Sequence, residues 1–280
     1  MNNLLPVTID KNIIRSVFER RDISDNTIDE YTRLLQSFLI FMTGRKVEDS
    51  TLLDYKRHLA NRIDISVAYK SKKLTAAIIF LQEIYGKEKF SVKNFKQTTG
   101  HKKEGITAQE AQDIFLYIYK KDSRTKAIIS LMYYQGLREI EIHRLDVEDI
   151  NLTDGTMMIK GKGRDDKEMV YLHPECAKAL KEFIPDEGIL FKSESTNGTN
   201  GGRLSTRSIR KIVSDLLKEC GINKTPHGFR HLYVTKVLDI LDGNVRQAMK
   251  FTRHKNVKTL MVYDDKRLTK EDLPRVFNEF

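Results

Sequence analysis

Cysteines and long apolar runs are both scarce in this chain of 280 residues. Its two cysteines, Cys176 and Cys220, lie 44 residues apart and form no C-x-x-C pair, which disfavours a disulfide framework and a structural zinc site. No stretch approaches the roughly 20 apolar residues that a membrane-spanning helix needs. The first residues also lack a basic stretch followed by an apolar core, so we expect no secretory signal, no membrane partner and a cytoplasmic location.

The charge balance is positive in both parts of the chain. Residues 1–100 carry 17 Lys and Arg against 12 Asp and Glu, and residues 101–280 carry 32 against 27, so each part contributes +5 to the net charge of +10. A positive balance along the whole molecule favours a polyanionic partner such as nucleic acid. Many lysine-rich proteins are basic without binding an anion, so the charge alone does not decide the function.

The first hundred residues show the periodicity of helices. Asp25 or Asn26 is placed as an N-cap before one apolar stripe, and residues 52–61 and 66–85 show similar recurrence. The stripe consists of Ile28, Tyr31, Leu34, Leu35, Phe38 and Met42. We therefore predict a small helical bundle.

A change of composition then marks a domain boundary. Residues 87–104 read KEKFSVKNFKQTTGHKKE, which is basic, polar and without periodicity. We predict a first domain at 1–97, a linker at 98–104 and a second domain at 105–280. The linker is either a solvated tether or a basic strap along a phosphate backbone.

The second domain reads as mainly helical with one β-hairpin. Thr107 and Glu110 form a capping-box pattern, and a helix over 124–135 should end at Gly136. Two short strands are predicted on either side of a turn that contains Lys162. They lie at 156–160 and 168–172, and further helices are predicted at 174–183, at 206–220 and from 226 onward. The predicted fold class is mainly α with a small antiparallel β-sheet.

Several basic and polar side chains of this domain are candidates for chemistry. They are Arg138, Lys162, His227, Arg230, His254 and Tyr263. Each alone has a simpler interpretation: Arg138 can pair with Glu139 or Glu141, Lys162 can be solvated at a hairpin tip, and Tyr263 can be a surface aromatic.

Together, these residue types describe a phosphodiester site. Two guanidinium groups can bind the non-bridging oxygens of a phosphate and stabilise the charge that grows as phosphorus becomes pentacoordinate. A tyrosine oxygen can attack phosphorus and form a covalent intermediate. A histidine can take the tyrosine proton, and a lysine can protonate the departing sugar oxygen.

The order and spacing of five motifs closely resemble those of the tyrosine recombinase (phage integrase) family, in its compact Xer-like form. Residues 26–41 also resemble the helical core-binding (SAM-like) domain of that family. The five motifs are GLREIEIHRL at 136–145, KGKG at 160–163, HGFRH at 227–231, His254 and Tyr263.

The resemblance assigns a role to each candidate residue. It implies that Tyr263 forms a 3′-phosphotyrosyl link, that Arg138 and Arg230 clamp the scissile phosphate, and that Lys162 is the general acid for the 5′-hydroxyl. His227 would be an acid and base, and His254 would hydrogen-bond the phosphate and assist the transition state. Strand exchange would need no cofactor, neither ATP nor a divalent ion.

Two details depart from the family pattern. The two residues before His254 are Thr-Arg where the family often has Leu-Gly, and Tyr263 is followed by two aspartates rather than a Thr-His pair. Neither change removes a catalytic group, although adjacent carboxylates disfavour a phenolate.

The end of the chain suggests an assembly. Residues 272–280 form an apolar helical stripe after a helix start at Asp272 and Pro274. The stripe can dock on its own domain, or, as the resemblance implies, insert into a neighbouring protomer. The second arrangement would build a homotetramer on two DNA duplexes that carry inverted-repeat core sites, associated with the nucleoid.

Three functions share this scaffold. The first is site-specific recombination, which would resolve or integrate mobile-element, plasmid or chromosomal DNA. The second is relaxation by a type IB topoisomerase-like enzyme, which the exchangeable C-terminal helix disfavours. The third is an accessory DNA-binding protein without catalysis, which the six competent residues disfavour.

Overall fold

The computed structural model describes residues 10–21, 23–86, 90–96, 105–161, 163–193 and 202–263. The chain divides into two compact units, residues 1–100 and 101–280. The predicted linker at 98–104 lies outside the described residues, so the domain limits of 1–97 and 105–280 stay predictions. No helix in the described part of the chain is both long and apolar enough to cross a membrane.

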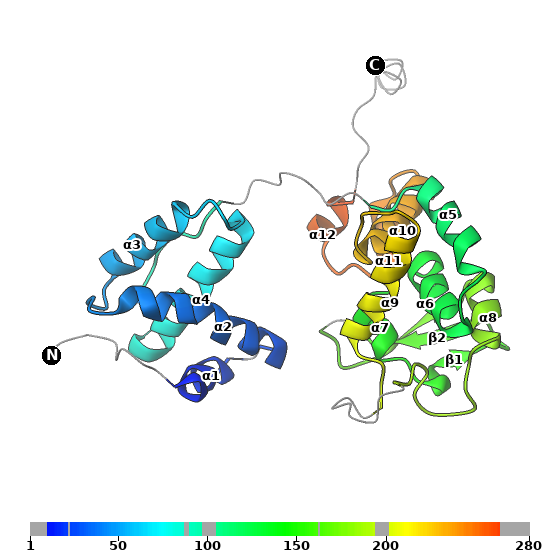
Figure 1. Cartoon of the computed structure of the whole chain (residues 1–280), viewed down its shortest axis with the longest axis horizontal. Coiled ribbons are helices and arrows are strands. Elements are labelled where there is room, and N and C mark those ends of the chain that lie inside the picture. Colours follow the sequence, from blue (N-terminus) through cyan, green and yellow to red (C-terminus); the bar gives the residue numbers. More distant parts are fainter. Residues whose placement is uncertain are drawn as a thin grey trace, which may run out of the picture. The chain divides into compact units, whose positions relative to one another are not determined.

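Four helices build the described part of the first unit (Figure 1). Its core combines aliphatic and aromatic side chains: the rings of Phe38 and Tyr55 meet edge to face at 4.9 Å, and Phe18 and Phe80 are fully buried. The helices are α1 Lys11–Glu19, α2 Asp25–Met42, α3 Asp49–Ala60 and α4 Val67–Tyr85. The bundle has the helices expected from the periodicity and one more, α1, which was not predicted separately.

The start of α2 corrects one prediction. The N-cap is Ser24, not Asp25 or Asn26, because Ser24 has the extended backbone of a cap and its carbonyl accepts the N–H of Thr27 at 2.8 Å. Asp25 lies instead in the first turn, where a carboxylate is favoured by the helix dipole, and pairs with Arg15 at 3.2 Å.

The second unit combines a three-stranded antiparallel sheet with helices (Figure 1). The strand order is β1-β2-β3, and Thr156 pairs with Tyr171 in the β2–β3 register. The elements are α5 Ala108–Ile118, α6 Ser123–Tyr134, α7 Glu139–His143, the 3-10 turn Val147–Asp149, β1 Ile150–Asn151, β2 Thr156–Ile159, β3 Glu168–Tyr171, α8 Pro174–Lys181, α9 Thr206–Glu219, α10 His227–Ile240, α11 Val245–Thr252 and α12 Val257–Met261. The predicted fold class, mainly α with a small antiparallel sheet, is confirmed.

Boundaries in this unit differ from the predicted ones by one or two residues. Both hairpin strands stop one residue early, β2 at Ile159 and β3 at Tyr171. The capping box at Thr107 and Glu110 is present in full. Strand β1 was not predicted, since two residues carry no periodicity.

The turn after α6 brings two segments into close approach. Gly136 has φ +58°, and a Cβ added there would lie 2.3 Å from Cδ1 of Tyr233. Gly155 has a similar φ of +62°, but a Cβ there would meet nothing within 4 Å. At Gly136, both the positive φ and the lack of space for a Cβ favour glycine, whereas at Gly155 only the positive φ does.

These two glycines give a matched pair for a stability prediction. We expect Gly155→Ala to cost about 1 kcal/mol, the strain of a left-handed alanine. Gly136→Ala should cost about 3 kcal/mol, because the overlap with Tyr233 adds to the strain. Urea unfolding of both variants measures this difference. Equal losses of unfolding free energy in the two variants would show that the Tyr233 side chain moves aside at no energetic cost.

Candidate active site

Helix α10 presents two of the candidate residues one turn apart. Thr225 and Pro226 precede the helix, with Pro226 at the N-cap, so that His227 is its first residue and Arg230 lies on the same face. Phe229 and Val234 are fully buried and anchor the helix in the core of the second unit. The HGFRH segment thus directs its imidazole and guanidinium groups from a fixed backbone.

Tyr263 is buried rather than a surface aromatic. It follows α12 and is 7% exposed, in a small apolar cluster with Val234, Leu238 and Leu260. Its Oη lies 3.0 Å from Nε2 of His227. A tyrosine hydroxyl and a possible proton acceptor are therefore in direct hydrogen-bond contact.

Two further imidazoles surround the tyrosine. The ring of His231 meets the Tyr263 ring edge to face at 5.1 Å, and the ring of His254 lies at 5.5 Å. Three histidines thus face the one phenol.

Arg230 carries a positive charge in the interior. The side chain is 1% exposed, donates from one Nη to the Gly136 carbonyl at 2.7 Å, and donates from the other to the Thr252 carbonyl. Its Nε is buried without a hydrogen-bond partner among the described residues. Burial, together with the positive charges of Arg138 and Arg253, lowers the pKa of Arg230 to about 9. A buried guanidinium close to two other cations is stabilised when an anion binds next to it.

Arg138 is held by a buried carboxylate. Glu141 is 1% exposed and accepts from Arg138 Nη1 at 2.8 Å and from the Arg138 backbone N–H at 2.9 Å. Arg253 donates to the same carboxylate at 3.2 Å. Burial acts to raise the pKa of Glu141, but Arg253 and Arg138 outweigh it, so the pKa is lowered and the carboxylate stays ionised. Arg138 does form the local ion pair expected of it, and it still lines a cleft.

His254 is oriented by a short chain of hydrogen bonds. Thr252 donates its hydroxyl to the Ala248 carbonyl at 2.7 Å, so its oxygen accepts from Nδ1 of His254 at 2.8 Å. The proton of the neutral ring is thereby placed on Nδ1, and Nε2 is buried with no partner among the described residues. Burial, then Arg230 and Arg138, lower the pKa of His254 to about 4. Burial and Arg138 also lower the pKa of His227.

The depressed pKa of His254 predicts a pH-dependent stability. Because the folded pKa lies near 4 and an unfolded histidine titrates near 6.5, the stability present above pH 6.5 should be lost as the pH falls through about 4, by about 3 kcal/mol. Urea unfolding at pH 7 and pH 4, compared with His254→Gln, isolates this contribution. The variant should lose less stability on acidification, and an identical loss would contradict the assignment.

A cleft of about 400 Å³ joins these groups to the hairpin tip. It is lined by Arg138, Arg253 and His254, and also by Gly161 and Gly163. These two glycines flank the predicted general acid, Lys162, which itself lies outside the described residues. The structure therefore brings five of the six candidates to one region and describes the sequence neighbours of the sixth.

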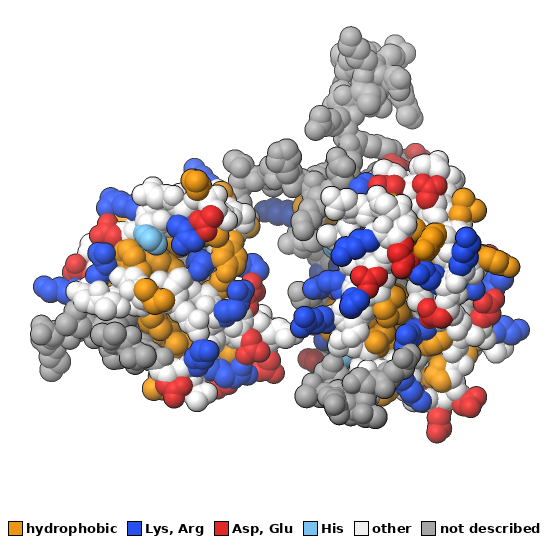
Figure 2. Space-filling model, viewed as in Figure 1, with side chains coloured by type: hydrophobic (Ala, Val, Ile, Leu, Met, Phe, Trp, Pro, Cys, Tyr) orange, Lys and Arg blue, Asp and Glu red, His pale blue; other side chains and the backbone are white. Residues whose placement is uncertain are grey.

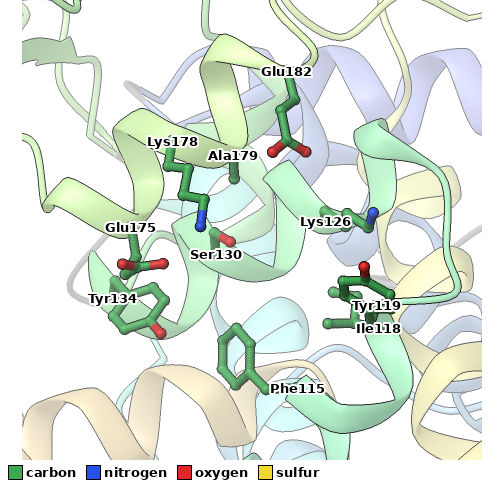
Figure 3. Close-up of a pocket in the computed structure, with 10 residues that line it drawn as sticks. All are labelled: Phe115, Ile118, Tyr119, Lys126, Ser130, Tyr134, Glu175, Lys178, Ala179 and Glu182. Atoms are coloured by element: carbon green, nitrogen blue, oxygen red, sulfur yellow. The ribbon is translucent and has the colours of Figure 1, made fainter.

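A second hollow, of about 230 Å³, shows none of these features. Residues of α5, α6 and α8 line it, among them Phe115, Tyr134 and Glu175 (Figure 3). None of the six candidate residues takes part. Within the described ranges, no three His, Cys, Asp or Glu side chains lie close enough together to hold a metal ion.

Three site residues had no role in the sequence prediction. The sequence predicted Glu141 only as a possible local ion-pair partner of Arg138. Arg253 was noted only as a departure from the family pattern, and His231 only as the last residue of the HGFRH motif. Their positions next to predicted residues in the sequence were the available signal.

The geometry agrees with the comparisons with known proteins. Residues 104–269, more than half of the chain, match the phage integrase family. The chain belongs to this family of tyrosine recombinases. A tyrosine recombinase of Synechocystis sp. is 27% identical over 288 residues, which cover 92% of each protein. Tyrosine recombinase XerD of Staphylococcus epidermidis is 24% identical over 293 residues, which cover 98% of each.

Solved structures of recombinases share the fold. The crystal structure of XerA recombinase is 26% identical, with a TM-score of 0.51 over 96% of this chain and 98% of that one. XerH bound to a palindromic difH substrate, a post-cleavage complex, has a TM-score of 0.73 at 18% identity, over 96% of this chain and 84% of that one. The second likeness concerns the fold alone.

Proposed function

We propose that this tyrosine recombinase cuts and rejoins DNA at a specific site, with Tyr263 as the nucleophile. The observation that carries the proposal is the 3.0 Å contact between Tyr263 Oη and His227 Nε2, in a region that also holds Arg138, Arg230 and His254. The named relatives are tyrosine recombinases, and XerH is a site-specific recombinase bound to its difH substrate.

The proposed reaction is an exchange of one phosphoester for another. Tyr263 Oη attacks the phosphorus, its proton passes to His227, and the bond from phosphorus to the 5′ oxygen breaks. Lys162 protonates that oxygen, and the 3′ phosphate remains on the tyrosine. A 5′-hydroxyl of a second strand then reverses the steps. The phosphotyrosyl bond conserves the energy of the phosphodiester, so rejoining needs no ATP.

Arg138 and Arg230 would stabilise the negative charge of the phosphate in the transition state. Arg230 Nε and the guanidinium of Arg138, which lines the cleft, can donate to the non-bridging oxygens, whose charge grows in the transition state. His254 would join them after DNA binds, because a phosphate near Nε2 raises the pKa of the imidazole and favours its second proton.

We further propose that double-stranded DNA with inverted-repeat core sites is contacted by both parts of the chain. Residues 1–97 would act as the core-binding domain, in the cytoplasm at the nucleoid. Lys and Arg are interspersed with Asp and Glu on the visible face of both units (Figure 2). The net charge of +10 therefore supports the proposal as an overall excess of positive charge, and the visible face shows no single basic patch.

The assembly would be a homotetramer on two duplexes. The C-terminal stripe at 272–280 lies outside the described residues, and its exchange between protomers stays a proposal. Removal of residues 268–280 should abolish synapsis while DNA binding by the protomer persists. Recombination at the normal rate without this segment would overturn the exchange.

A trapped intermediate tests the proposed reaction. The DNA is a nicked duplex whose sequence this protein has selected from a randomised pool, so that binding is established first. With a metal chelator present, the wild type should form an adduct that resists denaturation, because the short nicked strand diffuses away and prevents rejoining. A protein that binds this duplex tightly and never forms an adduct, even as a synapsed complex, would overturn the proposal.

A further inference from the structure

Arg253 adopts a backbone conformation that its residue type disfavours. Its φ is +57° and its ψ +35°, at the left-handed end of α11 where glycine is the usual residue. Within the described ranges, only Asp242 shares a positive φ among residues other than glycine. A long side chain in this region persists only where its surroundings hold it there.

The surroundings that hold Arg253 belong to the cleft. Its side chain is 5% exposed and donates to Glu141 at 3.2 Å, while Glu141 accepts from Arg138 at 2.8 Å through its other oxygen. A second carboxylate, that of Glu168, lies 3.8 Å from Nε of Arg253. One buried carboxylate therefore connects Arg253 to the guanidinium that is proposed to clamp the phosphate.

The backbone of Arg253 connects two more groups of the site. The preceding residue, Thr252, accepts from Arg230 through its carbonyl and from His254 through its hydroxyl oxygen. The following residue is His254 itself. The left-handed turn at Arg253 thus sets the relative direction of a carbonyl that holds Arg230 and of the imidazole that lines the cleft.

We propose that Arg253 is a positioning residue for strand transfer, which holds Glu141 so that Arg138 keeps its direction and its charge for the scissile phosphate. This inference rests on the proposed function. Glu141 is ionised and buried, so without Arg253 it would neutralise more of the positive charge of Arg138. Arg253 balances the carboxylate instead, and the cleft retains a net positive charge for an anion that becomes more negative in the transition state.

Three variants separate positioning from folding. Arg253→Gly accepts the left-handed backbone and removes the side chain, Arg253→Lys keeps the charge, and Lys250→Ala removes an exposed charge from the same helix as a control. Each is assayed for adduct formation at saturating protein on the nicked duplex, for the half-saturating concentration, and for the thermal midpoint. A second duplex carries a neutral methylphosphonate at the scissile position.

We expect Arg253→Gly to form adduct at least about tenfold more slowly, with an unchanged half-saturating concentration. Arg253→Lys should recover part of the rate, and Lys250→Ala all of it. The defect of Arg253→Gly should shrink at least about threefold on the methylphosphonate, where there is less charge to stabilise.

Two results would overturn the inference. One is a wild-type rate for Arg253→Gly, and the other is the same defect on both duplexes together with a lowered thermal midpoint, which would mark a structural role. A wild type that forms no adduct at all would overturn the proposed function instead.

Discussion

Tyr263→Phe should form no covalent adduct with DNA and should recombine no sites, although it binds the same duplex as tightly as the wild type. The substitution removes only the hydroxyl that attacks phosphorus, so the rate should fall by more than about 10⁴-fold. The ring keeps its place in the apolar cluster with Val234 and Leu260. Only the hydrogen bond to His227 is lost, which should cost about 1 kcal/mol of folding stability.

A gel assay for the adduct and a separate binding titration measure the two parts of this prediction. Tyr233→Phe is the matched control. It also removes a tyrosine hydroxyl, here from α10, and the bond of that hydroxyl to the Phe251 carbonyl, at 3.4 Å, is weak. The control should cleave normally. Residual adduct in Tyr263→Phe at a measurable rate would assign the nucleophile to another residue.

Arg230→Lys should lose the second largest share of activity. Lysine keeps the charge but has no planar fork, so it cannot donate to the Gly136 and Thr252 carbonyls and also present a further N–H to the phosphate. We expect cleavage to slow by roughly 10² to 10³-fold, as for the loss of one transition-state donor. The buried carbonyls left without a donor should also lower stability, by about 1 to 3 kcal/mol.

The loss of cleavage rate and the loss of folding stability in Arg230→Lys are measured separately. Single-turnover cleavage at saturating protein measures the first, and urea unfolding measures the second. Arg210→Lys is a suitable control, because Arg210 forms a similar two-point contact with Glu139 on an exposed surface. Cleavage at the wild-type rate by Arg230→Lys would show that only its charge matters.

Much of the fold was predictable because its signals are local. The capping box at Thr107 and Glu110, the hairpin around residue 162 and the apolar stripe of α2 each depend on residues a few positions apart. Errors arose where the signal was shortest or ambiguous. Strand β1 is too short for periodicity, and Ser24, Asp25 and Asn26 are all good N-cap residues.

The site was predictable as a set of residues but not as a set of contacts. The motifs point to Arg138 and His254 as candidates, yet no local pattern shows that Arg253 reaches a carboxylate 112 positions earlier in the chain. The same holds for Gly136, whose need for space comes from Tyr233 on a distant helix. Such contacts depend on how α10 and α11 pack against the turn after α6, which single-sequence patterns do not contain.

The position of the covalent bond tests the central claim most directly. The adduct formed on the nicked duplex in the presence of chelator is digested with protease and nuclease, and the remaining peptide is sequenced by mass spectrometry. We predict one modified peptide, with a nucleotide attached through its 3′ phosphate to Tyr263. A bond to any other side chain, or a link through a 5′ phosphate, would contradict the account.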